Sequence, residues 1–169
     1  MPGASATRAP IYVSAAVMLP LNLGSLATEC IMSALHTLNE FRESLYSRKH
    51  TLHQLRMKLQ QLPRELRAEA LLGVFADASR PETAFGDQEI AGQLLVSLHP
   101  ECVRPLDDIL RSTASTWNVS VEQLAIYVRD VFGREEVVEA STRLAADYPL
   151  ESREARALAT FQWWLTAKS

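Results

Sequence analysis

Hydrophobic and polar positions repeat along most of this chain with the period of an α-helix. The clearest stretch is NVSVEQLAIYVRDVFG, residues 118–133. Its main apolar residues recur at three- and four-residue steps and so share one helical face: Leu124, Val128 and Val131. Ser120, with Gln123 three residues later, fits a capping box at a helix start, and Gly133 fits a helix end. The stretch therefore predicts an amphipathic helix with a buried apolar face.

A longer apolar pattern runs through residues 25–62 with a spacing of seven. Two sets of positions, three residues apart, form this heptad seam: Ile31, Leu38, Leu45, Leu52 and Leu59, followed by Ala34, Phe41, Arg48, Leu55 and Leu62. Such spacing predicts a helix that buries one stripe against another helix. A continuous helix would be about 55 Å long at about 1.5 Å per residue. Because residues 46–50 contain no glycine or proline, the sequence favours one long helix, with a helical hairpin bent at YSRKH as the alternative.

Prolines and capping residues divide the rest of the chain into pieces of helical length. Pro63 and Pro105 suit the first turn of a helix, and Asp87 and Ser152 suit helix caps. A further helical pattern covers residues 135–147. Together with the two stretches above, these pieces predict an all-α fold, an irregular helical bundle of about seven helices.

The length of 169 residues and a hydrophobic content of 47% predict one domain, with a hydrophobic core large enough to fold without metal ions or disulfides. We expect residues 25–169 to form a single helical domain, with the long heptad helix or hairpin at 25–62 and the bundle at 63–169. Residues 1–24 are predicted to form an irregular N-terminal arm. Within this arm, IYVSAAVML, residues 11–19, alternates as a short strand does.

The charge is distributed unevenly along the chain. Residues 1–67 carry eight Lys or Arg against four Glu, whereas residues 68–169 carry nine against sixteen Asp or Glu. The basic excess between residues 42 and 67 makes nucleic-acid binding one hypothesis. Few aromatic residues accompany these cations, and the acidic remainder would repel a polyanion, so pairing with acidic groups of the protein or its partner is favoured.

Candidate catalytic and metal-binding residues are sparse. The six glycines are never closer than six residues apart, which excludes the usual phosphate-binding loops. Ligands of the types that zinc prefers do occur: His50, His53, His99 and Cys102. However, His50 and His53 occupy outward heptad positions, and Cys102 lacks a second catalytic signature. The sequence therefore predicts no metal, no cofactor and no catalytic residue, and it favours a non-enzymatic protein.

Two cysteines in a chain of this size predict reduced thiols and a cytoplasmic protein. No apolar run approaches the roughly 20 residues of a membrane-spanning helix, so no membrane association is expected. The alternative is a cleaved signal peptide, because Arg8 precedes an apolar run that ends near Ser25 and Ala27. Pro20 and Asn22 shorten that run and count against the alternative.

The adjacent residues Trp163 and Trp164 point about 100° apart on a helix. The sequence favours both closing the core from two sides, with one exposed as an interface anchor as the alternative.

The sequence predicts a non-enzymatic helical protein that acts through protein contacts, of an adaptor, immunity or secretion-associated type. Its partner is expected to be another protein or a second copy of the chain, a homodimer formed through the seam. The alternatives are nucleic-acid binding through residues 42–67 and a metal-binding or enzymatic protein that uses the three histidines and the cysteine named above. The residues expected to contact the partner are Ile31, Leu38, Phe41, Leu45, Leu52, Leu55, Leu59, Arg42, Arg48, Lys49, Arg56, Trp163 and Trp164.

Overall fold

The computed structural model describes the backbone of residues 25–166 and the side chains of residues 32–33 and 36–166. Eight α-helices and no strands lie within this part of the chain, which confirms the all-α prediction. They are α1 (Ser25–Tyr46), α2 (Leu52–Gln61), α3 (Arg64–Phe75), α4 (Ala84–Leu98), α5 (Leu106–Ala114), α6 (Gln123–Phe132), α7 (Arg134–Ala145) and α8 (Arg153–Thr166). The predicted arm at 1–24, with its strand at 11–19 and its signal-peptide alternative, lies outside the described residues.

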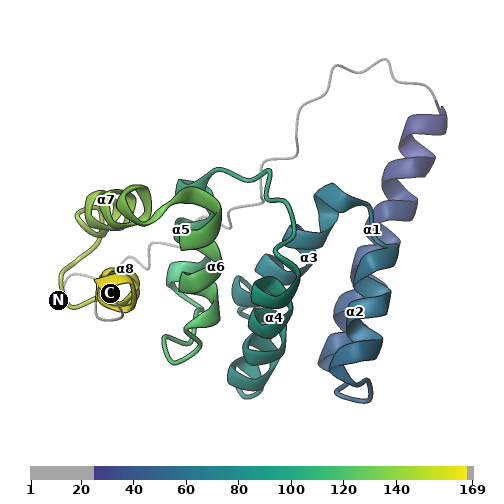
Figure 1. Ribbon diagram of the computed structural model, residues 1–169, viewed down its shortest axis with the longest axis horizontal. Coiled ribbons are helices and arrows are strands. Elements are labelled where there is room, and N and C mark those ends of the chain that lie inside the picture. The colour runs from purple at the N-terminus through teal and green to yellow at the C-terminus, as the bar shows by residue number, and fades with distance from the viewer. Residues whose placement is uncertain (1–24, 167–169) are drawn as a thin grey trace, which may run out of the picture.

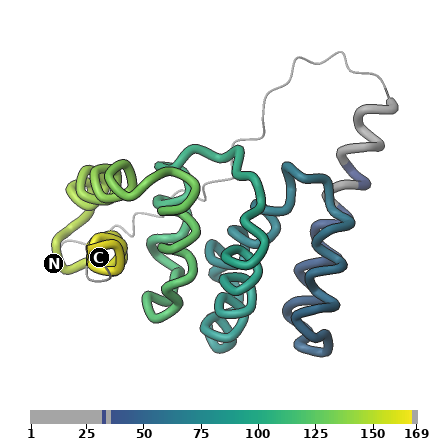
Figure 2. The backbone as a smooth tube through the Cα atoms, viewed as in Figure 1, coloured from purple at the N-terminus to yellow at the C-terminus, as the bar shows by residue number. Residues whose placement is uncertain are grey.

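The helices form an irregular bundle in which successive pairs are set in a row (Figure 1). Hairpin α1/α2 packs against hairpin α3/α4, which in turn packs on α5 and α6, and these two helices contact the last hairpin, α7/α8. In the described residues, α1 and α2 make no extensive contact with α5–α8. Figure 2 follows the backbone from the α1/α2 end of this row to α8, which is seen along its axis. The two ends of the row therefore present separate surfaces.

Residues 25–62 form a hairpin, so the favoured prediction of one long helix is wrong. Helix α1 ends at Tyr46 and α2 begins at Leu52. Arg48 takes a left-handed conformation with φ of 53°, which reverses the chain without a glycine. Thr51 then starts α2 with a capping box: its hydroxyl accepts from the amide of Gln54 at 3.3 Å, and its amide donates to Oε1 of Gln54 at 2.9 Å. This division explains why eight helices are present where about seven were predicted.

The predicted helix ends agree with the structure in part. Gly133 ends α6 with φ of 90°, and the hydroxyl of Ser152 accepts from the amide of Ala155 at 3.1 Å at the start of α8, as predicted. Asp87 does not cap α4, because this helix begins three residues earlier, at Ala84.

The predicted capping box of Ser120 and Gln123 is also absent, because α6 begins only at Gln123. Oδ1 of Asn118 accepts from the amide of Ser120 at 3.1 Å, and the carbonyl of Val121 accepts from the indole nitrogen of Trp117 at 3.0 Å. These bonds hold residues 118–121 in a turn and delay the helix start.

One continuous core runs through the whole row, from α1 to α8. Its largest fully buried side chains include Trp117, Tyr127, Phe75 and Phe161. No helix in the described part of the chain combines the length and the apolar character that crossing a bilayer requires.

Candidate functional site

The heptad seam lies mainly inside the protein's own core. The side chains of Leu38, Phe41, Leu45, Leu55, Leu59 and Leu62 are all buried. Folding back at residues 47–51 turns both halves of the seam toward α3 and α4. Among the seam residues with described side chains, Leu52 is exposed at 42%, and Arg48 is exposed as well; the side chains of Ile31 and Ala34 lie outside the described residues. This corrects the expectation that the seam presents an open face to a second chain, because the core of the same chain already covers it.

Several cations of the basic segment are bound within the protein. The half-buried guanidinium of Arg42 donates to the carbonyls of Glu69 and Ala70, at 3.0 and 3.2 Å. Burial lowers its pKa from the usual arginine value. Nζ of Lys58 donates to the hydroxyl of Ser44 at 2.7 Å, and it lies 3.5 Å from Nε2 of His50.

Arg67 is held in a similar way by the carbonyls of Gln60 and Leu62, at 2.7 and 3.0 Å. Lys49, Arg56 and Arg64 remain exposed on the surface. The cations of residues 42–67 therefore do not form the continuous open strip that a nucleic-acid backbone would require.

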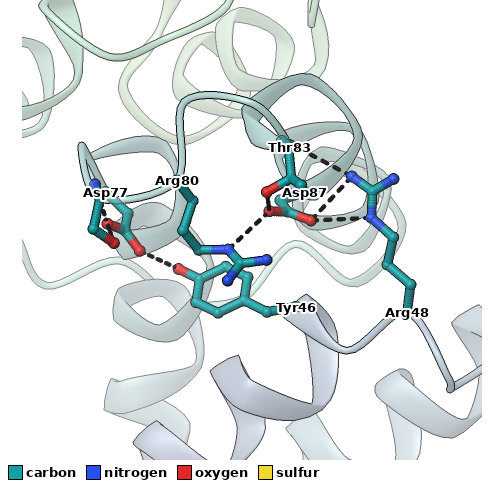
Figure 3. A network of polar contacts seen from close by, with 7 residues as sticks. Tyr46, Arg48, Asp77, Arg80, Thr83 and Asp87 are labelled. Carbon is teal, nitrogen blue, oxygen red and sulfur yellow. Dashed lines mark hydrogen bonds and ion pairs between the residues drawn. The ribbon is translucent and has the colours of Figure 1, made fainter.

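A network of polar side chains joins the α1–α2 turn to the loop between α3 and α4 (Figure 3). Its centre is Asp87, whose side chain is only 3% exposed. Arg48 reaches Oδ1 of Asp87 through Nε and Nη2, at 3.3 and 3.2 Å. Arg80 donates to Oδ2 at 3.3 Å, and the Thr83 hydroxyl donates to the same oxygen at 2.6 Å. Every donor in this set comes from the turn or the loop, so the carboxylate ties the two segments together.

The position of Arg48 depends on a glycine of α4. Its guanidinium passes so close to Gly86 that a Cβ atom there would lie 2.5 Å from Nη2. The same nitrogen donates to the carbonyl of Thr83 at 3.1 Å. Arg48 was predicted to contact a partner, but the structure uses its guanidinium within the fold.

Tyr46, Asp77 and Arg80 form the second part of the network (Figure 3). The Tyr46 hydroxyl donates to Oδ2 of Asp77 at 2.8 Å, and the guanidinium of Arg80 lies 4.4 Å from the centre of the Tyr46 ring. Partial burial acts to raise the pKa of Asp77, but hydrogen bonds from Ser79 and Tyr46 outweigh it and hold this pKa below its usual value. Burial, together with the bond to Asp77, raises the pKa of Tyr46.

This network is suited to holding helices together rather than to catalysis. Both oxygens of Asp87 already accept bonds, and Asp77 accepts from Tyr46 and Ser79, so neither carboxylate is a free base. The Tyr46 hydroxyl, with its raised pKa, stays protonated at neutral pH. We therefore assign the network a structural role, as the link between the first two hairpins.

Removing the central carboxylate tests this role. We expect Asp87→Ala to lower the free energy of unfolding by about 2 kcal/mol, less than the 3–5 kcal/mol typical of a broken buried pair, because Arg48 and Arg80 can rehydrate. Urea unfolding followed by circular dichroism measures this change. The control is Asp107→Ala, whose ion pair with Arg143 lies in solvent and should contribute little. Equal small effects of both substitutions would show that Asp87 does not tie the hairpins together.

The predicted zinc ligands are not brought together. His99 takes a left-handed conformation at the end of α4, and His50 lies beside Lys58. No group of three or more His, Cys, Asp or Glu side chains suited to a metal ion occurs among the described residues. The thiol of Cys102 donates to the carbonyl of Arg104 at 3.7 Å, and burial raises its pKa, which disfavours the reactive thiolate.

A groove of about 430 Å³ lies along α8, at the opposite end of the row from the hairpin α1/α2. We call it the α8 groove, and it is lined by Trp117, Asn118, Val119, Arg153, Arg156, Ala157 and Thr160. The α8 residues recur at three- and four-residue steps, so they share one helical face. The opposite wall is the 117–119 segment, for which the sequence predicted no binding role.

The wall of the groove is rigidly supported. Trp117 is 1% exposed, packs on Phe161 with ring centres 4.2 Å apart, and donates its indole proton to the carbonyl of Val121. Behind the segment, the amide of Asn118 donates at 2.7 Å to Oε1 of the buried Gln88. These bonds fix the 117–119 segment before any ligand arrives.

Two adjacent tryptophans lie beyond one end of the groove. The indole nitrogen of Trp164 donates to the carbonyl of Val119 at 3.0 Å, and its ring packs edge-on against Trp163, with centres 4.7 Å apart. Trp164 is partly buried against the core, whereas Trp163 is 56% exposed. The favoured prediction that both tryptophans close the core is therefore wrong, because their positions on α8 allow only one of them to face inward.

The cations of the groove are Arg153 and Arg156. Neither forms an ion pair with a carboxylate among the described residues, and the one hydrogen bond of Arg156 is a 3.4 Å contact from Nε to the carbonyl of Ser152. Neither arginine was predicted as a site residue; the signal was their three-residue spacing on the helix that carries the tryptophans. Comparisons with family models, with curated proteins and with solved structures found no match for this chain.

Proposed function

We propose that this protein is a non-enzymatic interaction protein that docks a segment of a partner protein in the α8 groove. The observation that carries the proposal is the combination of an exposed tryptophan, Trp163, with two groove arginines that have no carboxylate partner among the described residues. These arginines face the rigid 117–119 wall. Tryptophan and arginine are the residues most enriched at the energetic centres of protein interfaces.

The surroundings of the groove support a binding role. Val119 is an exposed apolar residue on the groove lining, and Trp163 adds an exposed aromatic ring at its end. Because Trp117 and Asn118 are already fixed by hydrogen bonds, a ligand would not have to order this wall. The proposal replaces the heptad seam by α8 as the partner surface, since the seam residues are covered by the core.

The test compares two double variants as baits. We expect Trp163→Ala/Arg156→Glu to lose at least one specific partner from extracts of the native host by about 30-fold or more, the effect of losing about 2 kcal/mol at an interface centre. Quantitative mass spectrometry of the captured proteins measures the loss.

The matched control is Phe85→Ala/Arg64→Glu, which removes an exposed aromatic residue and an exposed arginine from another part of the row. It should capture the same proteins as the unchanged chain. If the groove variant and this control capture identical sets of proteins, the proposed docking site is not used.

A further inference from the structure

We propose that the α8 groove selects an acidic segment of its partner, with two carboxylates near an apolar or aromatic side chain. This inference rests on the proposed function and adds the chemistry of the ligand to it.

Within the described residues, the groove arginines lack the carboxylate partners that many arginines of this protein have. Six other arginines of the described chain have carboxylate partners: Arg48, Arg80, Arg104, Arg111, Arg129 and Arg143. Arg153 and Arg156 have none there, and neither do Arg42, Arg56, Arg64, Arg67 and Arg134. Arg153 and Arg156 differ from these five in lining one groove together. No acidic side chain lines the groove itself. The groove is therefore a cationic site within a largely acidic half of the chain, and a carboxylate from outside would complete it.

The distance between these two arginines determines how far apart the carboxylates of a matching ligand lie. Residues three apart on a helix have Cβ atoms about 5–6 Å apart, so the two guanidiniums can meet two carboxylates of one short segment. Guanidinium and carboxylate pair through two parallel hydrogen bonds, which makes arginine selective for planar anions. Val119 on the groove lining and Trp163, which lies seven residues beyond Arg156 on α8, supply exposed apolar surface. A matching segment therefore combines acidic residues with at least one apolar or aromatic residue.

The surrounding charge favours a peptide over a nucleic acid. Residues 68–169, which contain the whole groove, carry nine Lys or Arg against sixteen Asp or Glu. Exposed glutamates occur in the chain between the two groove segments, for example Glu136, Glu139 and Glu151. These acidic residues would repel a long polyanion along its length, whereas a short acidic peptide would contact only the groove.

The experiment selects peptides from a random dodecapeptide library displayed on phage, using the full chain as bait. We expect the enriched peptides to contain two or more Asp or Glu together with an aromatic or large aliphatic residue. Synthetic versions of these peptides should bind at least ten-fold more weakly to Arg153→Glu/Arg156→Glu, as measured by fluorescence anisotropy. The control Arg56→Glu/Arg64→Glu makes the same change in net charge at exposed positions of α2 and α3, and it should leave binding unchanged.

A charge exchange guards against indirect effects of the substitutions. Peptides in which the acidic residues are replaced by Lys should bind the Arg153→Glu/Arg156→Glu variant better than the unchanged chain. Circular dichroism would confirm that the variant is folded. If the variant is folded but does not bind the Lys-substituted peptides better than the unchanged chain does, the acidic residues of the peptide do not pair directly with the two arginines.

The remaining outcomes separate the inference from the proposed function. Enriched peptides without acidic residues that lose binding on Trp163→Ala would overturn the acidic ligand but keep the groove as a docking site. Peptides that bind every groove variant unchanged would overturn both. A 20-nucleotide oligothymidylate that binds more tightly than the peptides, and is released by Arg153→Glu/Arg156→Glu, would make nucleic acid the occupant and overturn the peptide.

Discussion

Substitution of Leu45 by Asp is expected to abolish folding of the protein, because this position lies in the centre of the core. Leu45 has no exposed surface and packs among the buried residues of α1–α4. Removing such a leucine alone costs about 2–5 kcal/mol, and an unpaired carboxylate in its place adds a desolvation penalty. The sum is comparable to the whole stability of a typical domain, about 5–15 kcal/mol. Circular dichroism should show loss of the cooperative thermal transition.

The matched control is Leu52→Asp, one heptad further along the same seam. Leu52 is exposed, so we expect this variant to unfold at nearly the same temperature as the unchanged chain. Light scattering over a concentration series adds a second readout. A Leu45→Asp variant that stays folded but changes from dimer to monomer would restore the seam as an interface between chains and contradict its place in the core.

The heptad seam shows which part of the prediction succeeded and why the rest failed. Its spacing identified correctly that most of residues 25–62 are helical, in α1 and α2, and that one stripe is buried. A periodic pattern cannot say whether the covering surface belongs to the same chain, because both cases need the same apolar stripe. The break depended on Thr51 and Gln54, a capping pair visible in the sequence, and on Arg48, whose left-handed conformation is not.

The polar network around Asp87 shows a second reason why a prediction from the sequence was wrong. Asp87 was predicted to cap a helix because it precedes an apolar run. Because α4 begins earlier, Asp87 instead lies within the helix, where its buried carboxylate accepts hydrogen bonds from Arg48, Arg80 and Thr83. The 39-residue separation of Arg48 and Asp87 leaves no local pattern. The same holds for the α8 groove, since its 117–119 wall meets α8 only through tertiary packing. Local signals thus predict helices, whereas the sites depend on contacts between distant segments.

Substitutions of Trp117 and Trp163 are expected to affect the stability of the fold very differently. We expect Trp117→Ala to lower the free energy of unfolding by about 4 kcal/mol, because it leaves a cavity beside Phe161 and removes the bond to Val121. Trp163→Ala removes a largely exposed ring and should change stability by less than about 0.5 kcal/mol. Urea unfolding followed by circular dichroism measures both values.

Both substitutions should weaken partner binding, but for different reasons. Trp163→Ala keeps the fold and is expected to weaken the docking of a partner directly, whereas Trp117→Ala weakens it through loss of the rigid wall that this residue supports. Measured below the unfolding temperature of each variant, partner affinity should therefore fall in both, but stability only in Trp117→Ala. A large loss of stability in Trp163→Ala would mean that this ring closes the core, and its exposed position could then no longer support a role in docking.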